Sequence, residues 1–216
     1  MIDKKDIKRG ISLCVIVKNE EKMIRRTIAS VRDIVNEIIV VDTGSNDKTC
    51  ERARSVGAKI FHFNWCDDFS QARNFSLQQA SYEWILVLDA DEVIAKRDLG
   101  RLPQIVKDNN CEAVVLSQRN YCNSPDTEGW RASVSEYKEG DGYLGFFDVP
   151  VIRLFRNNGR IYFRGLVHEV VDQTTKGLKK RYLDVQIHHY SRYEDKEQRE
   201  RKSFFLSFFI IKTIRA

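Results

Sequence analysis

The chain has 216 residues, of which 42% are hydrophobic and 31% are charged, and its formal net charge is +5. A chain of this length can bury one substantial core, and the composition is ordinary for a soluble globular domain. The modest charge and the lack of any DNA- or RNA-reading motif argue against nucleic-acid binding, so we expect no nucleic-acid partner.

Cysteine use and hydropathy narrow the class of protein. The five cysteines, at positions 14, 50, 66, 111 and 122, include no Cys-x-x-Cys pair, so neither a zinc site nor a disulfide framework is indicated. The first residues lack the apolar core of a signal peptide. No apolar run reaches the roughly 18 residues that a membrane-spanning helix needs. We therefore expect a cytoplasmic protein.

The first part of the chain alternates strand patterns with helix patterns. Predicted strands cover residues 11–17, 37–41, 58–63 and 84–88, and predicted helices cover residues 23–31, 48–56 and 70–80. Such alternation is typical of parallel βαβ units with right-handed crossovers. We predict an α/β fold with a Rossmann-like, mostly parallel sheet flanked by helices.

Two carboxylates close the last of these strands. Asp89 and Asp91 follow the apolar run Trp-Ile-Leu-Val-Leu, and positions i and i+2 of an extended backbone point to the same side. Paired hard oxygen ligands suit Mg²⁺ or Mn²⁺. A solvated turn after the strand is the alternative, and it is the commoner meaning of an isolated Asp-x-Asp.

Polar side chains also close the first two strands. In parallel sheets ligands bind at the carboxyl ends of the strands, and the candidates there are Val17, Asn19, Glu20, Asp42, Ser45 and Asp47. The alternative for Asp42 is capping of the loop that follows it. Capping of a helix is the alternative for Asn19 and Glu20, and Asp47 is a candidate N-cap of the helix predicted at 48–56.

These segments resemble the successive motifs of family 2 glycosyltransferases. The matching stretches are residues 11–21, 37–49 and 89–92, in the order and spacing of that family. Residues 65–74 and 167–169 are similar to a narrower branch, which includes bacterial enzymes that glycosylate cysteine in bacteriocin peptides and lipopolysaccharide-core glucosyltransferases. The resemblance covers about residues 10–190.

The resemblance implies a GT-A fold and an inverting, metal-dependent hexosyltransferase. The donor would be a nucleotide sugar with a lean to UDP, held by the six strand-end residues together with Arg73, Asp89 and Arg153. The acceptor would be a peptide side chain or a glycan such as lipopolysaccharide. A non-catalytic or nucleotidyltransferase-like relative that binds a nucleotide is the alternative.

Val-His-Glu at residues 167–169 is a second chemical motif. Imidazole often completes the ligand set of a metal held by carboxylates, so His168 is a candidate ligand beside Asp89 and Asp91. Glu169 is a candidate for the base that deprotonates the acceptor. Adjacent side chains of an extended segment point to opposite sides, so the two would not share one task. A satisfied, partly buried histidine is the alternative.

Two further regions carry candidates. Four arginines and no acidic residue lie between positions 149 and 167, and a cation there could stabilise a diphosphate leaving group. Arg153 is the best of the four because it stands within an apolar strand pattern.

Residues 121–148 mix turn formers with aromatics, which indicates a functional loop that contacts the acceptor. Asp148, at the end of this loop, is a second candidate base.

We expect a domain over residues 1–190 and a helical tail over residues 191–216, which would be an interface or the stump of a helical extension. Within the tail, residues 203–214 are strongly apolar and follow a basic stretch. This segment is too short to span a bilayer. Packing on the domain or a homodimer contact is favoured over contact with the inner face of the membrane.

Overall fold

The computed structural model describes residues 7–107, 110–133, 136–166 and 170–190. One sheet organises this part of the chain. Its nine strands are β1 (Lys8–Val17), β2 (Glu37–Asp42), β3 (Lys59–His62), β4 (Tyr82–Val87), β5 (Glu92–Ile94), β6 (Ala113–Cys122), β7 (Arg131–Ala132), β8 (Gly145–Arg156) and β9 (Lys180–His189). The order across the sheet is β3-β2-β1-β4-β8-β6-β9-β5, and β7 pairs with β8 at one side.

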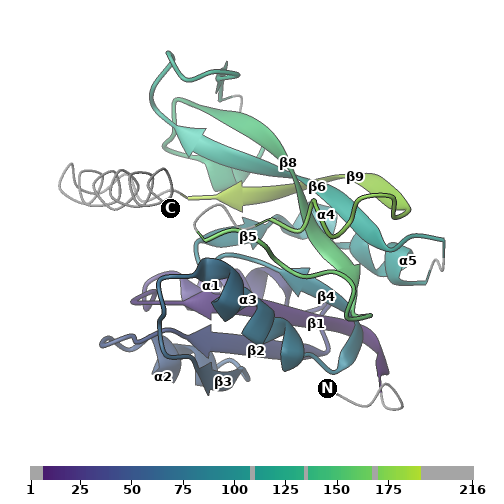
Figure 1. Cartoon of the computed structure of the whole chain (residues 1–216). Helices are drawn as coiled ribbons and strands as arrows, with labels where there is room; N and C mark the ends of the chain where they lie inside the picture. The colour runs from purple at the N-terminus through teal and green to yellow at the C-terminus, as the bar shows by residue number, and fades with distance from the viewer. Residues whose placement is uncertain (1–6, 108–109, 134–135, 167–169, 191–216) are drawn as a thin grey trace, which may run out of the picture.

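The sheet has a parallel half and a mixed half. Strands β3, β2, β1 and β4 are mutually parallel, whereas β8 runs antiparallel to both β4 and β6. Strand β6 runs parallel to β9, and β9 pairs antiparallel with β5. Among the described strands, therefore, only β8 and β5 oppose the common direction. Figure 1 shows the purple and blue strands of the parallel half below the green and yellow strands of the mixed half. The predicted α/β, mostly parallel sheet is confirmed.

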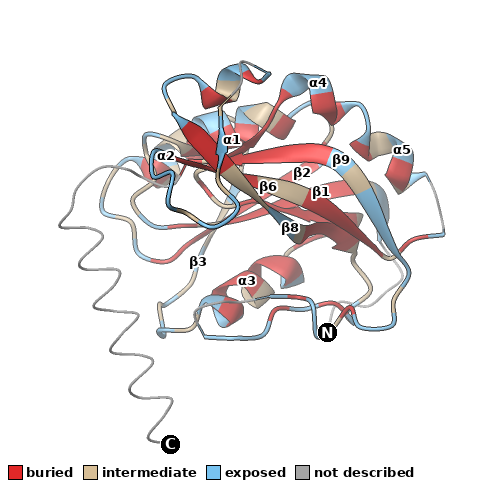
Figure 2. Cartoon of the chain, turned by 90° about the horizontal axis from the view of Figure 1, so that it is seen from above, coloured by how far each residue is buried: buried red, intermediate tan, exposed pale blue. Residues whose placement is uncertain are grey.

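Helices cover both faces of the sheet, as crossover connections require. The structure contains α1 (Ile24–Val31), α2 (Thr49–Arg54), α3 (Phe69–Gln78), α4 (Lys96–Leu99), α5 (Leu102–Val106) and a 3₁₀ turn, η2 (Lys138–Gly140). Figure 2 shows α3 on one side of the sheet and the α-helices α1, α2, α4 and α5 on the other. Each face therefore has its own core.

Local sequence explains these elements. All six residues of β2 are buried, as expected for a strand rich in Ile and Val that is covered on both faces. In α1 the buried positions are Ile24, Thr27, Ile28 and Val31, one stripe of a 3.6-residue period. The predicted strands and helices of residues 11–88 are all present, with bounds that differ by at most three residues at either end.

Two predictions about local structure need refinement. Lys48, not Asp47, occupies the N-cap position of α2, although Asp47 Oδ1 does accept the backbone N–H of Thr49 at 2.9 Å. The supposed loop at 121–148 begins within β6 and ends within β8, which pair antiparallel as far as Cys122 and Gly145. Only the residues between these two strands form the connection.

In the described part of the chain, no helix combines the length and the apolar character that a bilayer crossing requires. The tail predicted at 191–216 lies outside the described residues. Its helix, and its contact with a second copy or a membrane, therefore stay predictions.

Candidate active site

The carboxyl ends of β1, β2 and β4 meet at one edge of the sheet. Val17 and Asp42 are register partners at the ends of β1 and β2, and Asp89 follows β4 two residues after its last position. Because β1, β2 and β4 run parallel, all three ends lie at the same edge, and the predicted strand-end residues lie along it.

The loops after β1 and β2 bind each other through side chains. Ser45 Oγ accepts the N–H of Asn19 at 2.9 Å, and Asn19 Oδ1 accepts the N–H of Asn46 at 2.9 Å. Asn19 has a φ of +57°, a left-handed conformation that asparagine tolerates better than most residues. Asp47 Oδ2 accepts the N–H of Glu21 at 3.2 Å. The structure thus joins these predicted residues into one rim.

Asp42 lies buried behind this rim. Its carboxylate accepts the backbone N–H of Ser45 at 3.1 Å and that of Gly44 at 3.3 Å, so it does cap its own loop. His62 Nδ1 lies 3.4 Å from Asp42 Oδ2 and comes from the end of β3, where the two residues are register partners. Sequence reasoning missed His62, because only the pairing of β2 with β3 brings it to this edge.

Two arginines from different elements hold Asp89. Arg73 on α3 donates from Nη2 to Asp89 Oδ1. Arg153 on β8 donates from Nη2 to Asp89 Oδ2 at 2.7 Å and to Glu92 Oε1 at 2.7 Å. Both guanidinium groups are largely buried, with at most 9% of either residue exposed. Charge-assisted hydrogen bonds in such surroundings fix geometry strongly.

A β-bulge directs Arg153 to this cluster. Val114 pairs with Leu154, whereas the next residue, Val115, pairs with Ile152, so Arg153 is an extra residue in β8. A bulge of this kind redirects a side chain relative to the regular alternation of a strand. The charge of Arg153, in an otherwise apolar strand, thereby meets the carboxylates of Asp89 and Glu92.

The two acidic groups of the cluster differ in their ionisation. Burial opposes the charge on Asp89, but Arg153 and Arg73 outweigh it and hold the pKa of Asp89 well below its usual range. Burial raises the pKa of Glu92, and the charge of Arg153 only partly offsets this. Asp89 therefore keeps its negative charge more firmly than Glu92 does.

Asp91 faces a histidine that sequence reasoning left without a role. Nε2 of His189, at the end of β9, lies 3.6 Å from Asp91 Oδ2, and Nδ1 lies 2.7 Å from Asn120 Oδ1. Because that amide oxygen only accepts, Nδ1 carries the proton and Nε2 faces Asp91. Burial lowers the pKa of His189, but the neighbouring Asp91 carboxylate outweighs it and raises the pKa overall.

This pair fits a divalent cation. Carboxylates are common metal ligands, and so are imidazoles whose second nitrogen is held by a hydrogen bond. A cation bound by Asp91 and His189 would replace the proton on Nε2 of the imidazole. Within the described ranges, no group of three or more His, Cys, Asp or Glu side chains is arranged to hold a metal. Asp91 and His189 therefore offer a partial ligand set to which a ligand's oxygens would add.

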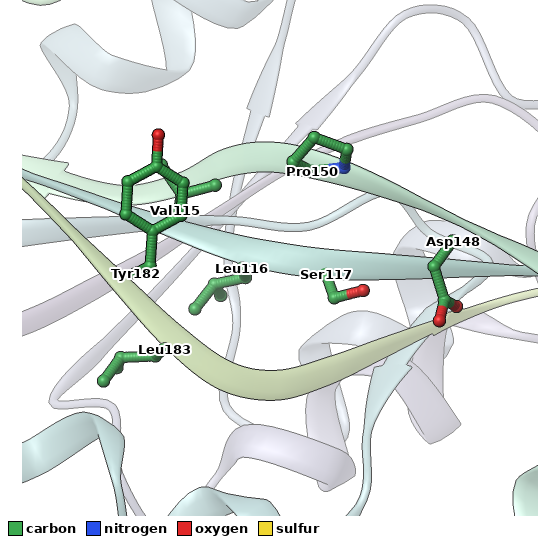
Figure 3. Close-up of a pocket in the computed structure, with 7 residues that line it drawn as sticks. All are labelled: Val115, Leu116, Ser117, Asp148, Pro150, Tyr182 and Leu183. Carbon is green, nitrogen blue, oxygen red and sulfur yellow. The ribbon is translucent and has the colours of Figure 1, made fainter.

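Asp148 belongs to a different environment. Arg119 Nε donates to its Oδ1 at 3.1 Å, and Arg131 Nη2 donates to its Oδ2, so guanidinium groups occupy both carboxylate oxygens. Asp148 also lines a shallow cavity of about 180 Å³ over β6, β8 and β9, together with residues such as Ser117, Pro150 and Tyr182. Figure 3 shows these side chains around the strands. None of the other predicted site residues lines it.

The Val-His-Glu motif lies outside the described residues, so the structure does not show His168 or Glu169. Its flanks are described. Arg164 and Val170 exchange two backbone hydrogen bonds of 3.0 Å, and the carbonyl of Leu166 accepts the N–H of Phe69 at 3.1 Å. The described residues on both sides of this motif are therefore anchored, and Leu166 lies beside the start of α3, the helix that carries Arg73.

Comparison with known proteins gives consistent matches. The family model described as "Glycosyl transferase family 2" matches residues 12–183. A TPR repeat-containing protein of Synechococcus elongatus is 37% identical over 78% of this chain and 37% of its own length. The SPbeta prophage-derived glycosyltransferase SunS of Bacillus subtilis is 34% identical over 74% of this chain and 34% of its own. The chain thus spans about a third of these relatives.

Solved structures with the same fold include two that contain nucleotides. Residues 1–349 of Staphylococcus aureus TarS, in complex with UDP-GlcNAc, match with a TM-score of 0.60 at 19% identity, over 86% of this chain and 60% of that one. Glucosyl-3-phosphoglycerate synthase of Mycobacterium tuberculosis, in complex with Mn²⁺, UDP and glucosyl-3-phosphoglycerate, matches with a TM-score of 0.58 at 18% identity, over 85% and 73% of the two chains. At these identities the likeness establishes the fold.

Proposed function

Because the chain belongs to glycosyl transferase family 2, we propose that it transfers a hexose from a UDP-sugar to a peptide side chain or a glycan, with inversion and with a divalent cation. The observation that carries this proposal is the Asp89–Asp91 turn. It lies at the carboxyl edge of the sheet between the Arg73 and Arg153 guanidinium groups and the His189 ring.

The nucleotide would bind along the rim that follows β1 and β2. Asp42 would accept a hydrogen bond from the base or the ribose. Its carboxylate would accept this bond in addition to those from the backbone N–H groups of Gly44 and Ser45. Arg73 is aimed at Asp89 from α3 and has the fork of donors that suits a phosphate or a base carbonyl. The other predicted rim residues, Val17, Asn19, Glu20, Ser45 and Asp47, would shape the pocket.

Mg²⁺ or Mn²⁺ would be held by Asp91 and His189, with Asp89 nearby and with His168 as a further candidate. When bound, the cation neutralises charge on the diphosphate leaving group. Arg153 would add positive charge on the same side, since its guanidinium already lies 2.7 Å from Asp89 Oδ2. Such preorganised charges act most strongly on the transition state.

In the transfer step, an acceptor oxygen or sulfur attacks the anomeric carbon while the bond from that carbon to the UDP oxygen breaks. The acceptor proton passes to a carboxylate, and Glu169 is our first choice. Asp148 is the weaker candidate because Arg119 and Arg131 already occupy its oxygens.

We propose a cytoplasmic location, with residues 203–214 providing a homodimer contact or contact with the inner face of the membrane.

Calorimetry of UDP binding tests the class and the cofactor together. If a cation bridges protein and diphosphate, the affinity for UDP rises when Mn²⁺ is present and falls when a chelator removes it. Equal affinity in both conditions would contradict the metal-dependent mechanism. Metal-coupled binding without any hydrolysis of UDP-glucose or transfer to a peptide or glycan would indicate a non-catalytic relative.

A further inference from the structure

We infer that Glu92 is a positioning residue that holds the Asp89–Asp91 turn in the form that binds the metal and the diphosphate. The inference rests on the proposed function, because it concerns how the same site is held. Glu92 directly follows Asp91 and begins β5. Its side chain is fully buried, so it acts through its neighbours and not on a ligand.

The Glu92 carboxylate contacts three hydrogen-bond donors. Oε2 accepts the backbone N–H of Asp89 at 2.7 Å. Oε1 accepts Arg153 Nη2 at 2.7 Å and Gln118 Nε2. These donors come from three separate places in the chain, namely the turn itself, β8 and β6. A carboxylate is the one side-chain group that offers only acceptors to all of them.

Glu92 therefore constrains Asp89 twice. It binds the Asp89 backbone directly, and it orients Arg153, which donates to the Asp89 carboxylate with the same nitrogen. It also constrains the other side of the turn, because Glu92 and His189 are register partners in the pairing of β5 with β9. The position of the Asp89 carboxylate thus depends on this one buried side chain in two ways.

The metal dependence of UDP binding gives the inference a readout that a purely structural role lacks. Glu92→Gln replaces an acceptor that holds the Asp89 backbone and Arg153 by an amide, and it leaves Arg73 and Arg153 in place to attract an anion. UDP affinity without metal should then stay equal, while the gain in affinity on adding Mn²⁺ should shrink.

The experiment compares Glu92→Gln with Glu37→Gln in the whole chain. Glu37 is another buried carboxylate of the same sheet, and it accepts hydrogen bonds from Ser12, Lys59 and Ser81. It stands at the start of β2, at the opposite edge from the turn. We expect Glu92→Gln to reduce the Mn²⁺-dependent gain in UDP affinity by about tenfold or more, as outer-shell changes at metal sites do. Glu37→Gln should leave that gain unchanged.

The possible outcomes separate this inference from the proposed function. If the unaltered protein shows no Mn²⁺-dependent gain, the proposed function fails and the inference fails with it. A gain in the unaltered protein that survives fully in Glu92→Gln would overturn the inference alone. If Glu92→Gln does not fold, Glu92→Asp replaces it. That change keeps the charge but shortens the reach to Asp89 and Arg153, so the gain should still fall, and a full gain would overturn the inference.

Discussion

Two carboxylate clusters stand at opposite edges of the same sheet, and they differ in their partners. At the start of β2, Glu37 accepts Ser12 Oγ at 2.8 Å, Ser81 N at 2.9 Å and Lys59 Nζ at 2.7 Å. At the carboxyl edge, Asp89 and Glu92 share the guanidinium group of Arg153. The first cluster satisfies one charge largely with neutral donors, whereas the second concentrates several charges beside an open rim.

The difference separates stability from function. Glu37 joins β1, β2, β3 and the start of β4 through short hydrogen bonds, which is a structural task that needs no ligand. The cluster around Asp89 instead keeps like charges close together, an arrangement that proteins maintain where a charged ligand or transition state completes the balance. Substitutions in the two clusters should therefore change different measurable quantities.

The largest effect should come from the base that deprotonates the acceptor. This base belongs to neither of the two clusters. Glu169→Gln preserves shape but removes basicity, so transfer to a hydroxyl acceptor should drop by about 10²–10⁴-fold while UDP binding survives. Asp148→Asn is the matched variant and should retain transfer. The reverse pattern in a steady-state assay would identify Asp148 as the base.

The next largest effect should follow removal of a ligand at the carboxyl edge. Asp91→Ala should lower the rate of transfer by about 10²–10³-fold, because the leaving diphosphate loses electrostatic stabilisation. It should also abolish the dependence of UDP affinity on Mn²⁺. Asp33→Ala, at an exposed position after α1, is the control and should change neither quantity. A normal rate of transfer in the Asp91 variant would show that the Asp89–Asp91 turn takes no part in the mechanism.

A stability effect without a functional one is expected at the other edge. Glu37→Gln should lower the free energy of unfolding by about 1–3 kcal/mol, because it leaves buried hydrogen-bonding groups poorly matched. The rate of transfer by the folded protein should be unchanged. Lys59→Met should cost less than about 1 kcal/mol, since the Lys59 side chain is 63% exposed. Urea denaturation at neutral pH measures both, and a larger loss for Lys59→Met would contradict the comparison.

The smallest expected effect is the pH dependence of the contribution that Glu37 makes to the free energy of unfolding. Burial opposes ionisation of Glu37, but the hydrogen bonds from Lys59, Ser81 and Ser12 outweigh it and lower the pKa below its usual value. Its contribution is therefore complete above the unfolded-state pKa of about 4.3 and is lost as the pH falls through the lower, folded-state value. The difference in unfolding free energy between the unaltered protein and Glu37→Gln should shrink as the pH falls below about 4. A constant difference would show that Glu37 is not ionised in the fold.

The sequence by itself determined the alternation of strands and helices, since apolar periodicity is a local property of the chain. It also located the turn at Asp89 and Asp91 and singled out Arg153 as a charge within an apolar strand pattern. Those features can be recognised within a few residues because they depend on side-chain types and on the period of one element.

Only the tertiary structure decided which groups meet. The contact of Arg153 with Glu92 joins residues 61 positions apart, and that of His189 with Asn120 joins residues 69 positions apart. Both depend on strand order, on register and on the bulge at Arg153, none of which is encoded by local periodicity. Because burial and register arise from packing of the whole sheet, Glu92 and His189 could be recognised as parts of the site only after the strands were placed.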